Sequence, residues 1–340
     1  MKKIGINGLG RIGRLVLHHY LKNKTEDIEI VAANDLADTD DLAYLLKYDS
    51  VYGVSEDTIE TDETSITITK KTDNAKINIP VFHEKNPGNI PWKKFDVDIV
   101  LECTGLFRRR EDAAKHLTAG ASKVIISAPS KSADLTIVQG VNEEEYDANH
   151  HDIISNASCT TNSLAPAVKL LNDLFTIKHV AVTTIHAYTT SQNLVDGNSR
   201  KRRRGRAAAI NLVPTTTGAA KATALVLPEL KGKMDAMAVR SPVVDGAITD
   251  IVAELKEEVT VDEVNDAFKT ASQGKMNGIL GYSEEDLVSS DIIGSDFSGI
   301  VDAGSTKVID NTLVKVLVWY DNEGGYAKKL LELSEYIAKK

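Results

Sequence analysis

The chain has 340 residues, a formal net charge of −9 and 42% hydrophobic residues. This length exceeds what one hydrophobic core usually serves, so we expect two domains. The charge excludes a molecule-wide basic surface for nucleic acid. Two cysteines without a C-x-x-C pair exclude a disulfide framework, and no apolar run is long enough for a signal peptide or a membrane span. We therefore expect a cytoplasmic protein without membrane contacts, and no histidine or cysteine spacing predicts a metal site.

The N-terminus has the pattern of a strand, a glycine turn and a helix. An apolar strand over residues 4–7 leads into Gly8-Leu9-Gly10-Arg11-Ile12-Gly13, and residues 14–21 carry helical spacing. Such a motif also occurs in ordinary turns. Here a second strand follows at 28–33 and ends near Asp35, where a carboxylate can bind a ribose and repel a 2′-phosphate. The sequence predicts a dinucleotide site that favours NAD over NADP.

Further apolar runs predict that the first strands belong to a parallel sheet. Residues 97–102 and 123–127 read as buried strands, separated by a helical stretch at 111–119, and 153–155 reads as the last strand. Ligands bind at the carboxyl edge of such sheets. The last strand would deliver Cys159 to that edge, facing the nicotinamide end of the cofactor.

Cys159 lies in the stretch Ser158-Cys159-Thr160-Thr161-Asn162. An isolated cysteine is usually a small buried hydrophobe. The polar neighbours and the helical spacing of residues 164–174 instead place this thiol at a helix N-terminus. Backbone N–H groups and the helix dipole would stabilise the thiolate there, so we predict a lowered pKa and a nucleophile. Pro166 predicts that the helix starts late or bends.

The second half contains a histidine at a strand end and a dense basic run. His186 emerges from the apolar strand 178–187 into a polar loop, although spacing alone favours a structural histidine over a catalytic one. The run Arg200–Arg206 has no aromatic residue to stack bases, which favours a solvated or interface loop with one or two functional arginines over a nucleic-acid site.

A second polar segment precedes a small-residue helix. Residues 214–221, Pro-Thr-Thr-Thr-Gly-Ala-Ala-Lys, could form an anion cradle or an ordinary capped helix start. Arg240 follows the strand-like residues 237–239 and could add a guanidinium for a phosphate. The other expected elements are a strand at 247–255, a helix at 260–271, a hairpin at 307–320 that turns near 310–311, and an amphipathic segment at 327–339 that packs back on the first domain.

Taken together, these residues resemble the phosphorylating glyceraldehyde-3-phosphate dehydrogenases along essentially the whole chain. The matching segments are Gly5–Arg14, Ser155–Asn162 and Trp319–Glu323. The resemblance implies an α/β protein with a Rossmann doubly wound parallel sheet plus an α+β catalytic domain whose sheet is mostly antiparallel. Residues 1–158 would form the NAD-binding domain, with the helix at 322–340 packed back on it, and residues 159–321 the catalytic domain.

The resemblance also implies a role for each site residue. Cys159 would be the nucleophile, and His186, 27 residues further on, the base that activates it. The cofactor would contact Gly8, Gly10, Arg11, Ile12, Gly13, Asp35, Thr104, Ser127 and Asn322, the last of which would hold the nicotinamide carboxamide. Inorganic phosphate would bind Ser158, Thr160, Thr217 and Gly218, and the substrate's phosphate Thr189 and Arg240, with Arg206 nearby.

The reaction implied is the NAD-dependent oxidation and phosphorylation of D-glyceraldehyde 3-phosphate to 1,3-bisphosphoglycerate in glycolysis and gluconeogenesis. The thiolate adds to the aldehyde, hydride passes to the nicotinamide, and phosphate attacks the resulting thioester. The expected assembly is a homotetramer.

The chain departs from the family pattern in two loops. Thr190-Ser191 stands where Asn or Gly and then Asp are usual, which alters the substrate-phosphate environment. Gly197-Asn198 replaces the Leu-Pro of NAD-preferring members, so use of NADP or of both cofactors is an alternative to NAD alone. Two further alternatives are an erythrose-4-phosphate dehydrogenase, whose members tend not to keep the Thr-Thr-Thr-Gly loop, and nucleic-acid binding through Arg200–Arg206.

Overall fold

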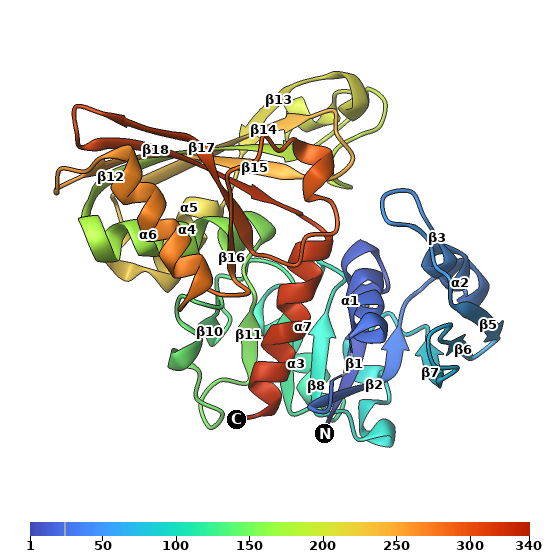
Figure 1. Ribbon diagram of the computed structural model, residues 1–340. Helices are drawn as coiled ribbons and strands as arrows, with labels where there is room; N and C mark the ends of the chain where they lie inside the picture. The colour runs from blue at the N-terminus through green and yellow to red at the C-terminus, as the bar shows by residue number, and fades with distance from the viewer. Residues whose placement is uncertain (24) are drawn as a thin grey trace. The chain divides into compact units, whose positions relative to one another are not determined.

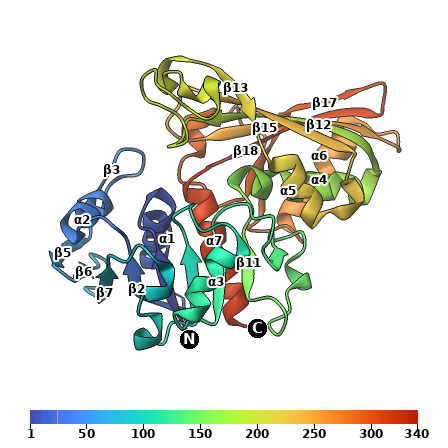
Figure 2. The ribbon, with the colours of Figure 1, turned by 180° about the vertical axis from the view of Figure 1, so that it is seen from behind.

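The computed structural model describes residues 1–23 and 25–340, which form two compact units. Unit 1 contains residues 1–137, 144–157 and 327–340, and unit 2 contains residues 138–143 and 158–326. Figure 1 shows the elements of each unit, and Figure 2 shows them from behind.

Unit 1 is built on a nine-stranded sheet in the order β10-β11-β9-β8-β1-β2-β7-β6-β5. Every pairing from β10 to β7 is parallel, and β7, β6 and β5 are joined antiparallel. The strands are β1 (Lys2–Asn7), β2 (Ile28–Asn34), β5 (Thr58–Asp62), β6 (Ser65–Thr69), β7 (Lys76–Phe82), β8 (Ile99–Glu102), β9 (Lys123–Ile126), β10 (Leu135–Thr136) and β11 (Ile153–Ser155), with a separate β3 (Tyr48–Asp49) and β4 (Gly53–Val54) hairpin. The predicted parallel sheet is confirmed.

Successive residues of a strand point to opposite sides of the sheet, and the parallel strands are apolar on both sides. Helices therefore cover both faces. On one face, Ile4 and Leu101 share a core with α1 (Arg11–Lys22) and α7 (Gly324–Ala338). On the other face, Val124 packs with α3 (Arg110–Thr118). The remaining helix of this unit, α2 (Thr39–Lys47), contacts β5.

Unit 2 contains a seven-stranded sheet in the order β13-β14-β12-β15-β18-β17-β16. Only the β12–β14 and β16–β17 pairs are parallel, so the sheet is mostly antiparallel, as predicted. The strands are β12 (Ile177–Ala187), β13 (Val213–Thr216), β14 (Met234–Ser241), β15 (Ala247–Leu255), β16 (Leu280–Ser283), β17 (Gly299–Ile309) and β18 (Leu313–Tyr320). The helices are α4 (Cys159–Phe175), α5 (Ala219–Val226) and α6 (Val261–Gln273).

Single turns of 3-10 helix connect the elements. They are η1 (Pro87–Asn89), η2 (Trp92–Phe95), η3 (Glu143–Glu145), η4 (Arg202–Gly205), η5 (Ala208–Ile210), η6 (Pro228–Leu230) and η7 (Ser289–Ile292).

The helix that carries the thiol differs from the prediction. It begins at Cys159 itself, although Pro166 stands inside it, so the expectation of a late start is wrong. The Ser158 side chain caps the helix by accepting from the Thr161 N–H at 3.1 Å. Burial of the apolar face, Pro166 included, offsets the hydrogen bond that proline cannot make.

Within the described residues, no helix is long and apolar enough to cross a membrane. The same residues hold no group of three or more histidine, cysteine or acidic side chains that could bind a metal.

Candidate active site

The glycine turn of unit 1 meets the demands of a dinucleotide-binding loop. Gly8 has a φ of +95°, a conformation that favours glycine. A Cβ added to Gly13 would lie 2.0 Å from the Gly8 carbonyl oxygen, so close packing of α1 requires glycine there too. Gly10 has no neighbour within 4 Å of an added Cβ and precedes the first residue of α1. The turn therefore exposes backbone N–H groups at a helix N-terminus, where anions bind.

A cavity of about 270 Å³ lies at the carboxyl ends of the parallel strands. Asp35 is fixed at this cavity because its carboxylate accepts from the Leu9 N–H at 2.7 Å and from the Ala37 N–H at 3.0 Å. The chemistry fits a nucleotide: an ordered carboxylate for a ribose and open glycine backbone for phosphates. The predicted cofactor residues in its lining are Gly8, Gly10, Asp35 and Thr104.

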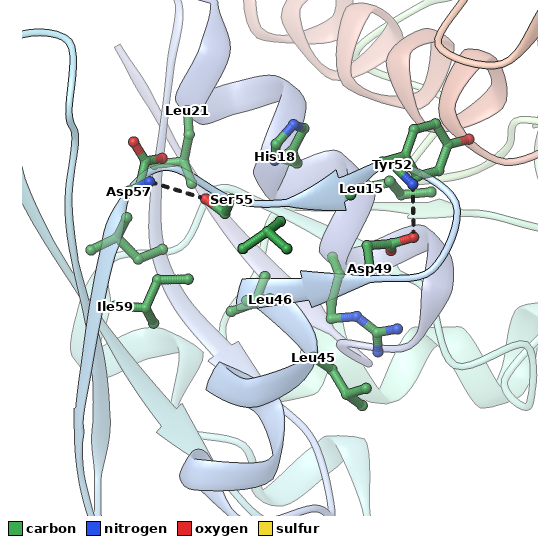
Figure 3. Close-up of a pocket in the computed structure, with 14 residues that line it drawn as sticks. Leu15, His18, Leu21, Leu45, Leu46, Asp49, Tyr52, Ser55, Asp57 and Ile59 are labelled. Atoms are coloured by element: carbon green, nitrogen blue, oxygen red, sulfur yellow. Dashed lines mark hydrogen bonds between the residues drawn. The ribbon is translucent and has the colours of Figure 1, made fainter.

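Five predicted cofactor residues are absent from this lining: Arg11, Ile12, Gly13, Ser127 and Asn322. Arg11 instead forms an ion pair with Asp49, which also accepts from the backbone of Val51 and Tyr52. Figure 3 shows the hydrogen bond between Asp49 and Tyr52 in the lining of another pocket. Burial opposes ionisation of Asp49, but these hydrogen bonds and Arg11 together lower its pKa. Both Ile12 and Ser127 lie outside the lining as well: Ile12 packs on the core, and the Ser127 side chain hydrogen-bonds Cys103, which does line the cavity.

In unit 2, Cys159 and His186 form a thiol–imidazole pair. Cys159 is the first residue of α4 and His186 lies at the end of β12, and the distance from Sγ to Nε2 is 3.5 Å. Cys159 as a whole residue is partly exposed, whereas His186 is only 4% exposed. This geometry allows the imidazole to take the thiol proton.

The other ring nitrogen of His186 faces two competing groups. His186 Nδ1 lies 2.7 Å from the Ala187 carbonyl oxygen and 2.9 Å from an Arg240 guanidinium nitrogen. A proton on Nδ1 donates to Ala187 and leaves Nε2 as an acceptor toward the thiol. If Nδ1 accepts from Arg240, the proton is on Nε2 and the ring cannot act as the base. The position of Arg240 therefore selects the tautomer.

The pKa shifts differ from the sequence expectation for Cys159. Burial raises its pKa to about 11, although Arg240 and hydrogen bonds from Thr160 oppose this. The predicted lowering is thus wrong for the protein alone: the helix N-terminus pulls in the expected direction, but burial outweighs it. Burial and then Arg240 lower the pKa of His186 to about 3, so the imidazole is neutral in the protein alone and one ring nitrogen is a hydrogen-bond acceptor.

Tyr320 is a site residue that sequence reasoning missed. Its hydroxyl lies 2.9 Å from the Thr160 hydroxyl and 2.8 Å from the Thr184 hydroxyl, and its ring meets His186 edge-on at 5.9 Å. Burial raises the pKa of Tyr320, which keeps it neutral. Its place at the end of a predicted strand, within the family-like segment Trp319–Glu323, was the available signal.

A group of cations surrounds the hydroxyl loop 215–217. Arg204 donates to the Thr215 hydroxyl at 3.0 Å and to the Ser191 hydroxyl at 2.9 Å, while Lys201 donates to the Thr216 hydroxyl at 2.6 Å. Burial lowers the pKa of Arg204, and burial and neighbouring arginines lower the pKa of Lys201. Among the described residues, neither Arg204 nor Lys201 forms an ion pair with an acidic side chain. The loop can therefore accept a multiply charged anion.

This group continues to the thiol–imidazole pair. The Ser191 hydroxyl lies 2.9 Å from the Thr189 hydroxyl, which Arg240 approaches at 3.5 Å. The structure thus brings Thr189, Arg240, His186 and Cys159 together in one unit.

Other predicted phosphate residues are engaged differently from expectation. Arg206 forms an exposed ion pair with Asp196 at 2.9 Å, so Arg204, not Arg206, is the arginine that faces the hydroxyls. The Thr217 hydroxyl accepts from the Ala219 N–H at 3.2 Å, and Gly218 precedes α5 with open space around it. Ser158 caps α4, and the Thr160 hydroxyl is buried against Tyr320.

Asn322 is also in unit 2, just beyond β18. Its side chain is 5% exposed, and its buried Oδ1 has no hydrogen-bond partner among the described residues. A buried acceptor without a donor is costly, so this oxygen fits a donor supplied by a ligand, such as an amide.

A glycine-turn nucleotide domain joined to a domain with a thiol–imidazole pair defines a nucleotide-dependent oxidoreductase. Comparisons with known proteins narrow this class. Residues 2–110 match the model of the glyceraldehyde 3-phosphate dehydrogenase NAD binding domain, and residues 158–322 match the model of that enzyme's C-terminal domain. The chain belongs to the glyceraldehyde-3-phosphate dehydrogenase family.

Similar proteins span nearly its full length. The chain is 53% identical to glyceraldehyde-3-phosphate dehydrogenase 1 of Bacillus subtilis and 54% identical to glyceraldehyde-3-phosphate dehydrogenase of Geobacillus stearothermophilus, each over 99% of this chain and 98% of the relative. It is 50% identical to glyceraldehyde-3-phosphate dehydrogenase 2 of a Nostoc species, over 100% of this chain and 99% of the relative.

Proposed function

We propose that this protein oxidises D-glyceraldehyde 3-phosphate with NAD and inorganic phosphate to give 1,3-bisphosphoglycerate, in glycolysis and, in reverse, in gluconeogenesis. The observation that carries this proposal is the 3.5 Å approach of Cys159 Sγ to His186 Nε2, beside Arg240, Arg204 and Lys201. The pair supplies a nucleophile with its base, and the cations supply charge for phosphate groups.

Cys159 attacks the aldehyde carbon while His186 Nε2 takes the thiol proton. The raised pKa of Cys159 makes this base necessary, since little free thiolate exists at neutral pH. A thiohemiacetal forms on the sulfur, and oxidation converts it into a thioester. NAD, when bound, supplies the acceptor for the hydride.

Arg240 links the substrate to the base. A phosphate that draws the guanidinium toward Thr189 would remove the donor that competes for His186 Nδ1. The ring then keeps its proton on Nδ1, where Ala187 accepts it, and Nε2 is free to act. Substrate binding thus prepares the base.

Inorganic phosphate attacks the thioester in the second half of the reaction. The hydroxyl loop 215–217, with Arg204 and Lys201 bonded to it, is the proposed binding place, together with Thr217, Gly218 and the Ser158 and Thr160 flanks of Cys159. The acyl group passes to the phosphate oxygen and the sulfur leaves. His186 then returns the proton, acting as acid after acting as base.

We infer a preference for NAD over NADP. The Asp35 carboxylate is held in place by two backbone N–H groups, and a fixed negative charge disfavours a 2′-phosphate. Gly197-Asn198, in place of Leu-Pro, weakens the preference for NAD but does not reverse it. The orphan acceptor on Asn322 supports its role in holding the nicotinamide amide.

The test is one kinetic matrix on glyceraldehyde 3-phosphate, with NAD or NADP and with or without phosphate. We expect reduction of NAD that requires phosphate or arsenate, and a lower kcat/KM with NADP. Reduction that is indifferent to phosphate and arsenate would contradict the proposal. Erythrose 4-phosphate, measured under the same conditions, tests the alternative of an erythrose-4-phosphate dehydrogenase. A higher kcat/KM for erythrose 4-phosphate than for glyceraldehyde 3-phosphate would favour that alternative.

Nucleic-acid binding through Arg200–Arg206 has less support. Lys201, Arg203 and Arg204 are bonded to residues 214–216, and Arg206 is paired with Asp196, so most of the run is committed within the protein.

We further propose a cytoplasmic homotetramer. Exposed Leu194, Val195, Ile210 and Leu212 support an assembly, which sedimentation can measure.

A further inference from the structure

Unit 1 buries a carboxylate that has no lysine or arginine partner among the residues that the structure describes. Glu102, at the end of β8, is 0% exposed, and its ion-pair partner among the described residues is His116, also 0% exposed. A buried charge of this kind is costly unless hydrogen bonds satisfy it. Neither residue was singled out by the sequence, and the proposed chemistry uses neither.

Four donors converge on this carboxylate. Its Oε1 accepts from the Thr104 N–H at 2.9 Å and from the Thr104 hydroxyl. Its Oε2 accepts from Asn7 Nδ2 at 2.6 Å and from His116 Nε2 at 3.0 Å. Both oxygens of the Glu102 carboxylate are therefore satisfied by hydrogen bonds.

One end of the network fixes the tautomer of His116. Trp92 in η2 can only donate, and its Nε1 lies 3.0 Å from His116 Nδ1. Nδ1 must then be the acceptor, so the ring proton is on Nε2, facing Glu102. The indole sets the direction of this arm.

The other end fixes two amides. The Glu84 N–H donates to Asn34 Oδ1 at 2.9 Å, and Asn34 Nδ2 donates to Asn7 Oδ1, also at 2.9 Å. This leaves Asn7 Nδ2 to donate to Glu102. Neither amide can flip without setting two donors against each other. Both arms of the network therefore end on the same carboxylate.

The residues held in this way line the cavity that carries Asp35. Asn7, Asn34 and Thr104 all belong to its wall, whereas Trp92, His116 and Glu102 lie behind it. We propose that Glu102, His116 and Trp92 form a positioning relay that presets the polar wall of the nucleotide cavity. This inference rests on the proposed binding of NAD there.

The test is Glu102→Gln, which keeps the shape and replaces one acceptor with a donor. The amide would face either Thr104 or the pair Asn7 and His116, and no tautomer or flip satisfies both. We expect the Kd for NAD, measured by calorimetry on the apoprotein, to rise about 10- to 100-fold, the scale for a buried charged hydrogen bond. KM for NAD should rise in parallel, whereas kcat and the alkylation rate of Cys159 should change less than about twofold.

The matched control is Glu111→Gln on α3, which makes the same charge change at an exposed position. It should leave the Kd for NAD unchanged. A Glu102→Gln protein that is less stable to urea but binds NAD as tightly as the parent would overturn the relay and leave a packing role only. If the parent itself does not bind NAD, the proposed function fails instead.

Trp92→Phe gives a second, milder test, which also decides the matter if Glu102→Gln does not fold. Phenylalanine keeps an aromatic ring at this position but lacks the N–H that donates to His116 Nδ1. The Kd for NAD should therefore rise about twofold to tenfold, the scale for a neutral hydrogen bond. The double variant should raise the Kd by less than the product of the single effects, because His116 can then accept from the new amide. An unchanged Kd for Trp92→Phe, or strictly multiplicative effects, would show that the residues act independently.

Discussion

The network around Glu102 and the unit that carries the thiol differ in how their buried polar groups are satisfied. Behind the nucleotide cavity, every donor around Glu102 has an acceptor, and the hydrogen bonds allow one His116 tautomer and one orientation of each amide. In unit 2, Arg240 Nε and both polar atoms of the 8% exposed Gln192 lack partners among the described residues, as does Asn322 Oδ1. A completed network holds a surface in one shape, whereas an incomplete one reserves its groups for ligands. The comparison predicts that substitutions in unit 2 act on chemistry and those in the relay act on cofactor affinity.

The largest effect should follow removal of the nucleophile. Cys159→Ser should lower kcat with glyceraldehyde 3-phosphate by about 10⁴-fold or more, since the loss of a covalent nucleophile acts on this scale. The Kd for NAD should stay within about threefold of the parent, because the nucleotide cavity lies in unit 1. Retention of turnover would remove the thiol from the mechanism.

His186→Asn should come next. The neutral imidazole faces the thiol through Nε2, and its loss removes the base. Acylation, measured as the burst of NADH in single-turnover experiments, should slow by about 10²- to 10⁴-fold. A burst at the parent rate would assign His186 a structural role.

The contributions of individual cations to phosphate binding can be separated by comparing substitutions of two arginines. Arg204→Gln should raise KM for phosphate or glyceraldehyde 3-phosphate about 10- to 100-fold, because it donates to Thr215 and Ser191. Arg202→Gln, a charge removal at an exposed position of the same run, is the control and should change neither KM by more than about twofold. A larger effect of Arg206→Gln than of Arg204→Gln would restore the sequence-based assignment.

The last prediction concerns thiol reactivity, where the smallest effect is the shift of its pH profile on substitution of Arg240. The pKa of Cys159 is raised to about 11, so the thiolate fraction in the apoprotein should increase about tenfold per pH unit between pH 6 and 9. The rate of alkylation by a neutral reagent reports this fraction. Arg240→Gln removes a charge that lowers this pKa, so its profile should shift to higher pH. A plateau below pH 7 would show instead that a thiolate–imidazolium pair already exists.

Much of the fold could be predicted from apolar spacing. The glycine turn, the buried strands of the parallel sheet and the turn at Asp310 and Asn311, which have φ values of 50° and 55°, were all indicated by local pattern. Strands β5, β6 and β7 were missed: most residues of β5 and β6 are polar, and Pro80 interrupts the apolar pattern of β7. The start of α4 was misplaced because the proline rule ignores tertiary burial.

The site was predictable in kind but not in detail. The residue types and spacing of Cys159 and His186 pointed to nucleophile and base, and the structure places them within reach of one another. The pKa of Cys159 depends on burial and on Arg240, which is distant in sequence, so no local pattern could give its direction. Likewise, nothing in the basic run distinguishes Arg204 from Arg206 until the chain folds and Asp196 pairs with one of them.

The raised pKa of Cys159 also bears on the lifetime of the protein. Oxidants such as peroxide attack thiolates far faster than thiols, and the later products of that reaction are irreversible. A thiol that stays protonated until a base accepts its proton is therefore shielded while the enzyme is idle. We expect the burial that makes His186 necessary to slow oxidation of the nucleophile in the protein without ligands.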